Sequence, residues 1–98
     1  MRKFIKYKKR HSSFMNLQDK YMAIAREFTG KVLQKYPDKV DVIILFGSTA
    51  RGEAREESDI DILVVGEVTL DELVNISFPM LLEYKKYISP KDMKKTLF

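Results

Sequence analysis

The sequence predicts a single α/β domain in which helices and strands alternate along the chain. Three observations lead to this prediction. The chain has 98 residues, a length that one hydrophobic core can serve. Apolar residues recur at three- and four-residue steps in two segments, 12–36 and 70–87, as they do on one face of a helix. Two short runs between these segments, 40–46 and 59–65, are rich in β-branched residues, as buried strands are.

The first helix is expected over residues 12–36. Its apolar stripe consists of Phe14, Leu17, Tyr21, Ile24, Ala25, Phe28 and Val32. Ser12 or Ser13 can cap its start, because a short polar side chain accepts a hydrogen bond from the free N–H groups of the first turn. Pro37 ends the helix. Residues 1–11 precede it as a basic arm, so the single domain is expected over residues 12–98.

The two strands enclose a charged loop. The first strand, 40–46, reads VDVIILF and is too continuously apolar for a surface strand. Residues 48–51 can form one turn of helix, and residues 52–58 form a polar loop. The second strand follows at 59–65 and is closed by Gly66.

A second helical region is expected over residues 70–87. Pro79 lies inside it and must either kink the helix or restart it with Ser77 as the cap. Residues 87–88 indicate a short third strand. The segment SPKD at 89–92 resembles a helix start, with serine as cap, proline at the first position and aspartate in the first turn. The predicted order is therefore α-β-α-β-α-β with a terminal helical turn.

The net charge of +4 is concentrated at the N-terminus. The first ten residues contain no acid and six basic residues, namely Arg2, Lys3, Lys6, Lys8, Lys9 and Arg10. Such a run is either a solvated arm or a contact for nucleic acid. The charges in the rest of the chain nearly balance, so nucleic-acid binding is not the expected main function.

The residue types exclude several chemistries. The chain has no cysteine, which rules out disulfides, thiolate metal sites and a cysteine nucleophile. Its one histidine, His11, rules out a multi-histidine zinc site, and its place at the end of the basic arm does not suit a Ser-His-Asp triad. No apolar run approaches the roughly 20 residues of a membrane span, and no apolar signal segment follows the N-terminal charges. We expect a cytoplasmic protein.

Two aspartates stand at the start of the second strand. Because side chains alternate along a strand, Asp59 and Asp61 lie on one face, opposite Ile60 and Ile62. Two carboxylates that close repel each other, and a divalent cation removes this repulsion. Oxygen ligands without histidine or cysteine favour a hard ion such as Mg²⁺. The pair is therefore a candidate metal site.

A candidate phosphate cradle precedes these aspartates. Gly47 follows the first buried strand and, lacking a Cβ atom, lets a phosphate approach the backbone closely. The N–H groups of the next turn point towards such a phosphate, and Ser48 adds a hydroxyl donor. A phosphate cradle beside a carboxylate pair suits nucleoside triphosphate chemistry, in which a metal bridges the phosphates and the carboxylates.

The spacing of these residues resembles that of a known family. Gly47-Ser48, ten residues and Asp59-Ile60-Asp61 match the G-S-x10-D-x-D signature of the DNA polymerase β-like nucleotidyltransferases. The segment FGSTARGEAREESDIDILVV is similar to the FGSxARGxxxxxSDxDLxV form of the minimal nucleotidyltransferases (MNT). The resemblance implies a small mixed three-stranded sheet covered by helices. It also implies transfer of a nucleoside monophosphate from ATP or another NTP to a hydroxyl, with release of pyrophosphate.

The resemblance also implies a role for each matching residue. Gly47 and Ser48 would hold the β- and γ-phosphates, and Asp59 and Asp61 would bind two Mg²⁺ ions. Arg51 stands at the arginine of the family's ARG sequence. It either reaches the triphosphate or forms an ion pair with an acid of the 52–58 loop.

One family feature is missing. The family usually has a third carboxylate on the next strand, and no acid lies between Glu83 and Asp92. Glu83 is expected on a helix surface and Asp92 at a helix cap. Glu67 and Asp71 follow the second strand, but their spacing does not place them at the site.

Two functions remain open. Relatives of this size pair with HEPN-domain toxins and add AMP to a toxin tyrosine, so the resemblance implies a HEPN partner and an antitoxin role. The alternative is a weakly active or inactive NTP-binding module that neutralises its partner by contact. The sequence also leaves a homo-oligomer open.

Overall fold

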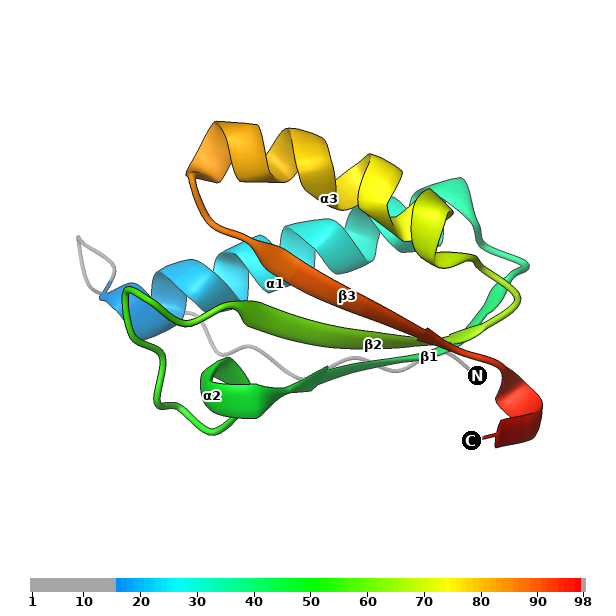
Figure 1. Ribbon diagram of the computed structural model, residues 1–98, viewed down its shortest axis with the longest axis horizontal. Coiled ribbons are helices and arrows are strands. Elements are labelled where there is room, and N and C mark those ends of the chain that lie inside the picture. Colours follow the sequence, from blue (N-terminus) through cyan, green and yellow to red (C-terminus); the bar gives the residue numbers. More distant parts are fainter. Residues whose placement is uncertain (1–15, 98) are drawn as a thin grey trace.

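The computed structural model describes residues 16–97, and the basic arm expected at 1–11 lies outside this part of the chain. Helices and strands alternate in the predicted order (Figure 1). The elements are α1 (Leu17–Lys35), β1 (Val40–Phe46), α2 (Gly47–Ala50), β2 (Ile60–Gly66), α3 (Leu70–Tyr84), β3 (Ile88–Met93) and a 3-10 turn (Lys95–Leu97). No helix within residues 16–97 is long and apolar enough to cross a membrane.

The three strands form one mixed sheet in the order β1-β2-β3. β1 and β2 are antiparallel, whereas β2 and β3 are parallel. Ile60, Ile62 and Val64 of β2 are completely buried in the core that the sheet forms with α1 and α3. Because side chains alternate along a strand, Asp61 and Leu63 point to the opposite face. This small mixed sheet covered by helices confirms the expected fold.

α1 begins later than the apolar pattern predicts. Asn16 is its N-cap, and the side-chain oxygen of Asn16 accepts a hydrogen bond from the backbone N–H of Asp19 at 2.8 Å. The caps expected at residues 12–13 lie outside the described residues. From Leu17 onward the predicted stripe packs into the core, with Phe28 and Val32 completely buried, whereas Phe14 lies outside the described residues.

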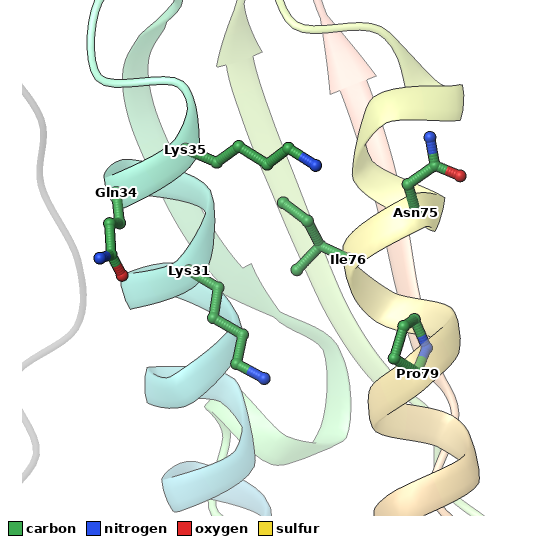
Figure 2. Close-up of a pocket in the computed structure, with 6 residues that line it drawn as sticks. All are labelled: Lys31, Gln34, Lys35, Asn75, Ile76 and Pro79. Atoms are coloured by element: carbon green, nitrogen blue, oxygen red, sulfur yellow. The ribbon is translucent and has the colours of Figure 1, made fainter.

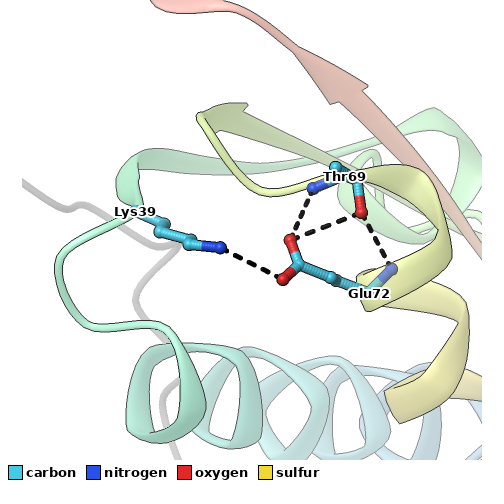
Figure 3. Close-up of polar contacts among 3 residues, drawn as sticks. All are labelled: Lys39, Thr69 and Glu72. Atoms are coloured by element: carbon cyan, nitrogen blue, oxygen red, sulfur yellow. Dashed lines mark hydrogen bonds and ion pairs between the residues drawn. The ribbon is translucent and has the colours of Figure 1, made fainter.

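A capping box starts α3 (Figure 3). The hydroxyl of Thr69 accepts the backbone N–H of Glu72 at 3.2 Å, and the Glu72 carboxylate accepts the backbone N–H of Thr69 at 2.9 Å. Lys39, in the turn before β1, pairs with the same carboxylate at 3.2 Å. The Thr69 N–H, followed by Lys39, lowers the pKa of Glu72. The start of α3 is thus tied to the turn that leads into β1.

α3 runs through Pro79 as one helix, so the alternative of a restart capped by Ser77 is wrong. Ser77 is buried, and its hydroxyl donates to a carbonyl one turn earlier. Pro79 cannot donate to the carbonyl of Asn75, but both residues are exposed and water can take the place of that bond. The helix ends at Tyr84, three residues earlier than predicted, and Lys85 follows in the left-handed conformation.

The segment SPKD is a strand, so the prediction of a helix start at residues 89–92 is wrong. β3 spans Ile88–Met93 and pairs with β2 along its length. Pro90 is tolerated because β3 is an edge strand, where one side of the backbone needs no donor. Asp92 is an exposed strand residue rather than a helix cap. Pairing with the buried β2 overrides the local preference for a helix cap. The predicted terminal helical turn follows at Lys95–Leu97.

Candidate active site

The two aspartates lie where β2 begins, beside the end of β1. Asp61 is half-buried and pairs with Phe46, the last residue of β1, on one side and with Ser89 of β3 on the other. Asp59 is exposed and directly precedes β2. The alternation that buries Ile60 directs both aspartates to the face of the sheet opposite the core. Both aspartates therefore lie at the start of β2, on the side of the sheet away from the core.

Gly47 lies against the carboxylate of Asp61. Its φ of +78° is in the left-handed region that favours glycine. A Cβ atom at this position would overlap Oδ2 of Asp61 and stand 3.2 Å from its Cγ. Gly47 is also the first residue of α2, the predicted turn of helix. The sharp turn from β1 into α2 thus places the backbone of Gly47 in direct contact with Asp61.

Ser48 and Arg51 line a hollow of about 360 Å³ at the loop that leads to Asp59. The rest of its lining comes from the loop that follows, namely Glu53, Arg55, Glu57 and Ser58. Arg51 forms an ion pair with Glu53 at 2.9 Å, the second of the two alternatives that the sequence leaves open. Both side chains of this pair are more than 60% exposed, so it contributes at most about 1 kcal/mol. An anion in the hollow can compete for Arg51.

Two tight turns shape the loop between α2 and β2. The N–H of Glu53 donates to the carbonyl of Ser48 at 2.8 Å. Further along, the N–H of Arg55 donates to the Ser58 hydroxyl and the N–H of Ser58 donates to the Arg55 carbonyl, each at 3.0 Å. Ser58 therefore orders the turn that delivers Asp59 to the start of β2.

Gln18 of α1 holds this loop, a contact that sequence reasoning missed. Its amide nitrogen donates to the carbonyl of Thr49 at 2.7 Å, and its amide oxygen accepts the N–H of Ala54 at 3.2 Å. The two partners are 31 and 36 residues away in sequence. Gln18 follows Leu17 on an amphipathic helix, and its position in the sequence pattern does not distinguish it from a solvent-exposed residue.

A second anchor joins α1 and the approach to β3 to the same loop. Lys86 is 8% exposed, and its ammonium group donates to the carbonyl of Glu56 at 2.9 Å. The hydroxyl of Tyr21, itself buried, donates to the same carbonyl at 3.3 Å. The ammonium also lies 4.4 Å from the centre of the Tyr21 ring, within cation-π range. Lysine is rarely buried, and nothing in the sequence around Lys86 predicts its burial.

β3 offers no third carboxylate at this site. Its residues on the face of Asp61 include Ser89, which is paired with Asp61, and Lys91, whose ammonium donates to the Ser89 hydroxyl at 3.0 Å. No cluster of three histidine, cysteine, aspartate or glutamate side chains occurs within residues 16–97. Glu67 follows the far end of β2, roughly 25 Å along the strand from Asp59.

Another hollow, of about 330 Å³, lies between α1 and α3 (Figure 2). Its lining consists of Lys31, Gln34, Lys35, Asn75, Ile76 and Pro79. None of these residues shares the strand face that carries the aspartates. Lys31 already pairs with Glu27 at 3.2 Å. This hollow belongs to the helical layer and not to the candidate active site.

Comparison with known proteins identifies the family of this chain. The model of the nucleotidyltransferase domain family matches residues 25–95. MJ0604 of Methanocaldococcus jannaschii is 42% identical over 73 residues, which cover 74% of this chain and 73% of the relative. MJ0141 of the same organism is 43% identical over 79 residues, which cover 76% of this chain and 80% of the relative. Both relatives bear the provisional name of protein adenylyltransferase.

A solved structure supports the same assignment. The crystal structure of a Sulfolobus solfataricus protein, provisionally named a nucleotidyltransferase, superposes with a TM-score of 0.52 at 26% sequence identity. The superposition covers 81% of this chain and 71% of that one. With the family model spanning most of the chain and MJ0604 well above 30% identity, the protein belongs to the minimal nucleotidyltransferase family, whose members are enzymes that use a nucleoside triphosphate.

Proposed function

We propose that this protein transfers AMP from ATP to a hydroxyl group of a protein, at the site formed by Gly47, Ser48, Asp59 and Asp61. The contact between Gly47 and Asp61 carries this proposal. It sets the first residue of α2 against a carboxylate, so a phosphate bound at the start of α2 would lie within reach of any cation held by Asp61.

The triphosphate would bind through the start of α2. The backbone N–H groups at the start of α2 and the Ser48 hydroxyl would donate to the β- and γ-phosphates. Arg51 lines the same hollow and would exchange its exposed ion pair with Glu53 for a phosphate oxygen. Its guanidinium would then bind the phosphate with two parallel hydrogen bonds.

The donor set fits a hard divalent cation. Asp59 and Asp61 offer only carboxylate oxygens, and within residues 16–97 no ion pair engages either of them. They would hold the two Mg²⁺ ions that the family resemblance implies, with phosphate oxygens and water as the remaining ligands. When bound, such ions neutralise the phosphate charge and lower the pKa of a coordinated hydroxyl.

The acceptor is proposed to be a protein side chain because MJ0604 and MJ0141 bear the name of protein adenylyltransferases. The name also favours ATP among the nucleotides. The family resemblance further suggests a separately encoded HEPN toxin as the acceptor, which this protein would silence as an antitoxin. The exposed position of Asp59 suits a macromolecular acceptor, because a bulky partner can reach it.

The test is to incubate the purified protein with α-labelled ATP, Mg²⁺ and the product of the gene adjacent to its own. We expect label on the partner and release of pyrophosphate. Asp59→Asn and Asp61→Asn should abolish both while leaving the protein folded. Binding of the partner without any transfer would overturn the proposal.

The absence of a third acid on β3 favours a second candidate function. Ser89 stands beside Asp61 where a carboxylate would complete the metal site. A chain with only two metal ligands would retain the nucleotide as a structural cofactor and neutralise its partner by contact. Tight, nucleotide-dependent binding of the partner, with neither label nor pyrophosphate, would identify this function.

A further inference from the structure

Tyr87 lies beside the proposed metal-binding aspartates. It directly precedes β3, and its carbonyl accepts the N–H of Ile60 at 3.1 Å. Ile60 is paired with Ile88, and both side chains are completely buried on the core face. Their neighbours Asp59 and Tyr87 therefore lie opposite each other on adjacent strands and share the other face of the sheet. Tyr87 is also 47% exposed.

The order of the strands places Tyr87 on the side of the site opposite Gly47 and Ser48. Gly47 and Ser48 follow β1, Asp59 and Asp61 lie at the start of the central β2, and Tyr87 leads into β3. A phosphoryl acceptor attacks in line with the leaving group. If the β- and γ-phosphates rest on the β1 side, the acceptor must approach from the β3 side, where Tyr87 lies.

The other tyrosines within residues 16–97 are placed differently. Tyr21 is buried and donates its hydroxyl to the Glu56 carbonyl. Tyr84 donates its hydroxyl to the Glu27 carboxylate, and this bond raises the pKa of Tyr84 to about 12. Tyr36, at the end of α1, packs its ring against the lysines on either side of the turn that follows. None of the three has an exposed, unengaged hydroxyl beside the aspartates.

We propose that Tyr87 is an acceptor for AMP, so that the protein adenylylates itself within one chain. This inference rests on the proposed function, because it uses the same ATP site. The Tyr87 oxygen would bond to the α-phosphorus while the bond from that phosphorus to the oxygen bridging to the β-phosphate breaks. Pyrophosphate leaves with the bridging oxygen, and the phenolic proton passes to solvent. The product is an AMP-tyrosine phosphodiester on the edge strand.

The experiment measures self-modification of the full chain with ATP and Mg²⁺, in the absence of any partner. Mass spectrometry of the intact protein should show one added AMP residue, and peptide mapping should place it on Tyr87. The first-order rate constant should not change when the protein is diluted, since the transfer occurs within one chain. Tyr87→Phe should remove the adduct, whereas the matched control Tyr36→Phe should keep it.

Binding of a non-hydrolysable ATP analogue with Mg²⁺ separates this inference from the proposed function. Tyr87→Phe should bind the analogue as the wild type does, which shows that the variant is folded. An adduct on another residue, or a rate that rises with protein concentration, would overturn the assignment of Tyr87 within its own chain. Analogue binding without any adduct would overturn the self-modification and leave transfer to a partner intact. Failure to bind the analogue would overturn both.

Discussion

Gly47 and Asp61 are in contact across the junction of β1 and β2, and this contact leaves no room for a side chain at position 47. A Cβ atom there would overlap the Asp61 carboxylate, and the φ of +78° already excludes most residues. The G-S-x10-D-x-D spacing thus has a physical basis, because the second aspartate of the motif, on the neighbouring strand, requires the glycine. A side chain at position 47 would therefore disturb the start of α2 and Asp61 together.

Gly47→Ala should therefore weaken nucleotide binding and slow the transfer. The new methyl group must displace Asp61 by about an ångström, and a misplacement of this size costs about 10²-fold in rate. The left-handed conformation adds about 1–2 kcal/mol of strain to the folded state. Steady-state kinetics and urea unfolding measure the two effects.

Gly52→Ala is the matched control, because Gly52 has nearly the same φ, +76°, and a Cβ atom added there would meet no atom within 4 Å. It should lose the same stability but keep its activity. Equal losses of activity in both variants would show that strain, and not the contact with Asp61, is responsible.

The sequence pattern predicts those parts of the structure that local periodicity determines. The buried alternation of β2 and the turn at Gly47 and Ser48 follow from side-chain period and glycine chemistry. The strand at Ile88–Met93 cannot be predicted in this way, because its serine and proline favour a helix start. Its extended conformation is determined by pairing with β2. The start of α1 is set by Asn16 in place of an earlier serine.

In the candidate site, too, some features follow from the local sequence and others depend on tertiary packing. The carboxylate pair and the cradle can be predicted because each occupies a short segment. Gln18 and Lys86 cannot, because their partners lie 30 to 36 residues away and each interaction depends on how α1 and β3 pack around the loop. Polar residues that bond to the backbone of a distant loop produce no recurring sequence pattern by which they could be predicted.

Gln18→Glu should weaken ATP binding without unfolding the protein. Glutamate keeps the acceptor for the Ala54 N–H but loses the donor to the Thr49 carbonyl, a bond of 2.7 Å. Loss of one such bond costs about 1 kcal/mol, which corresponds to roughly a fivefold rise in KM for ATP if α2 shifts. Kinetics with varied ATP measure this, and an unchanged KM would show that α2 needs no support from α1.

Thr69→Ala should destabilise the protein by about 1 kcal/mol, the usual cost of losing an N-cap. The variant loses the hydroxyl that accepts the Glu72 N–H, although Glu72 can still accept the N–H of residue 69. Thr69→Ser keeps the acceptor and should stay near the wild type. Because the capping box lies at the end of β2 remote from Asp59, transfer activity at saturating ATP should not change.

Tyr84→Phe should reduce stability in a pH-dependent manner, because the variant loses the bond to Glu27. The bond to Tyr84 lowers the pKa of Glu27, so its contribution is present above the ordinary carboxyl pKa and is lost as pH falls through the lowered value. The pKa of Tyr84 is raised from 10 to about 12, so its contribution is present below about pH 10 and lost as pH rises through about 12.

The difference in urea midpoint between the wild type and Tyr84→Phe should accordingly be constant between about pH 5 and pH 10. It should shrink outside that window on both sides. Glu27→Gln keeps an acceptor that does not titrate, so the decline on the acid side should disappear in that background. A difference that is independent of pH in the wild-type background would contradict the assignment.

Tyr21 and Lys86 should show a non-additive effect on stability, because both donate to the carbonyl of Glu56. In Tyr21→Phe the ammonium still satisfies that carbonyl, and in Lys86→Met the hydroxyl does. Lys86→Met also removes a buried charge, which offsets part of its loss. Only the double variant leaves the carbonyl without a protein donor, so it should lose about 1 kcal/mol more than the two single losses combined.

A double-mutant cycle from urea unfolding measures this coupling. Strict additivity would mean that water reaches the Glu56 carbonyl and that the two side chains do not hold the loop.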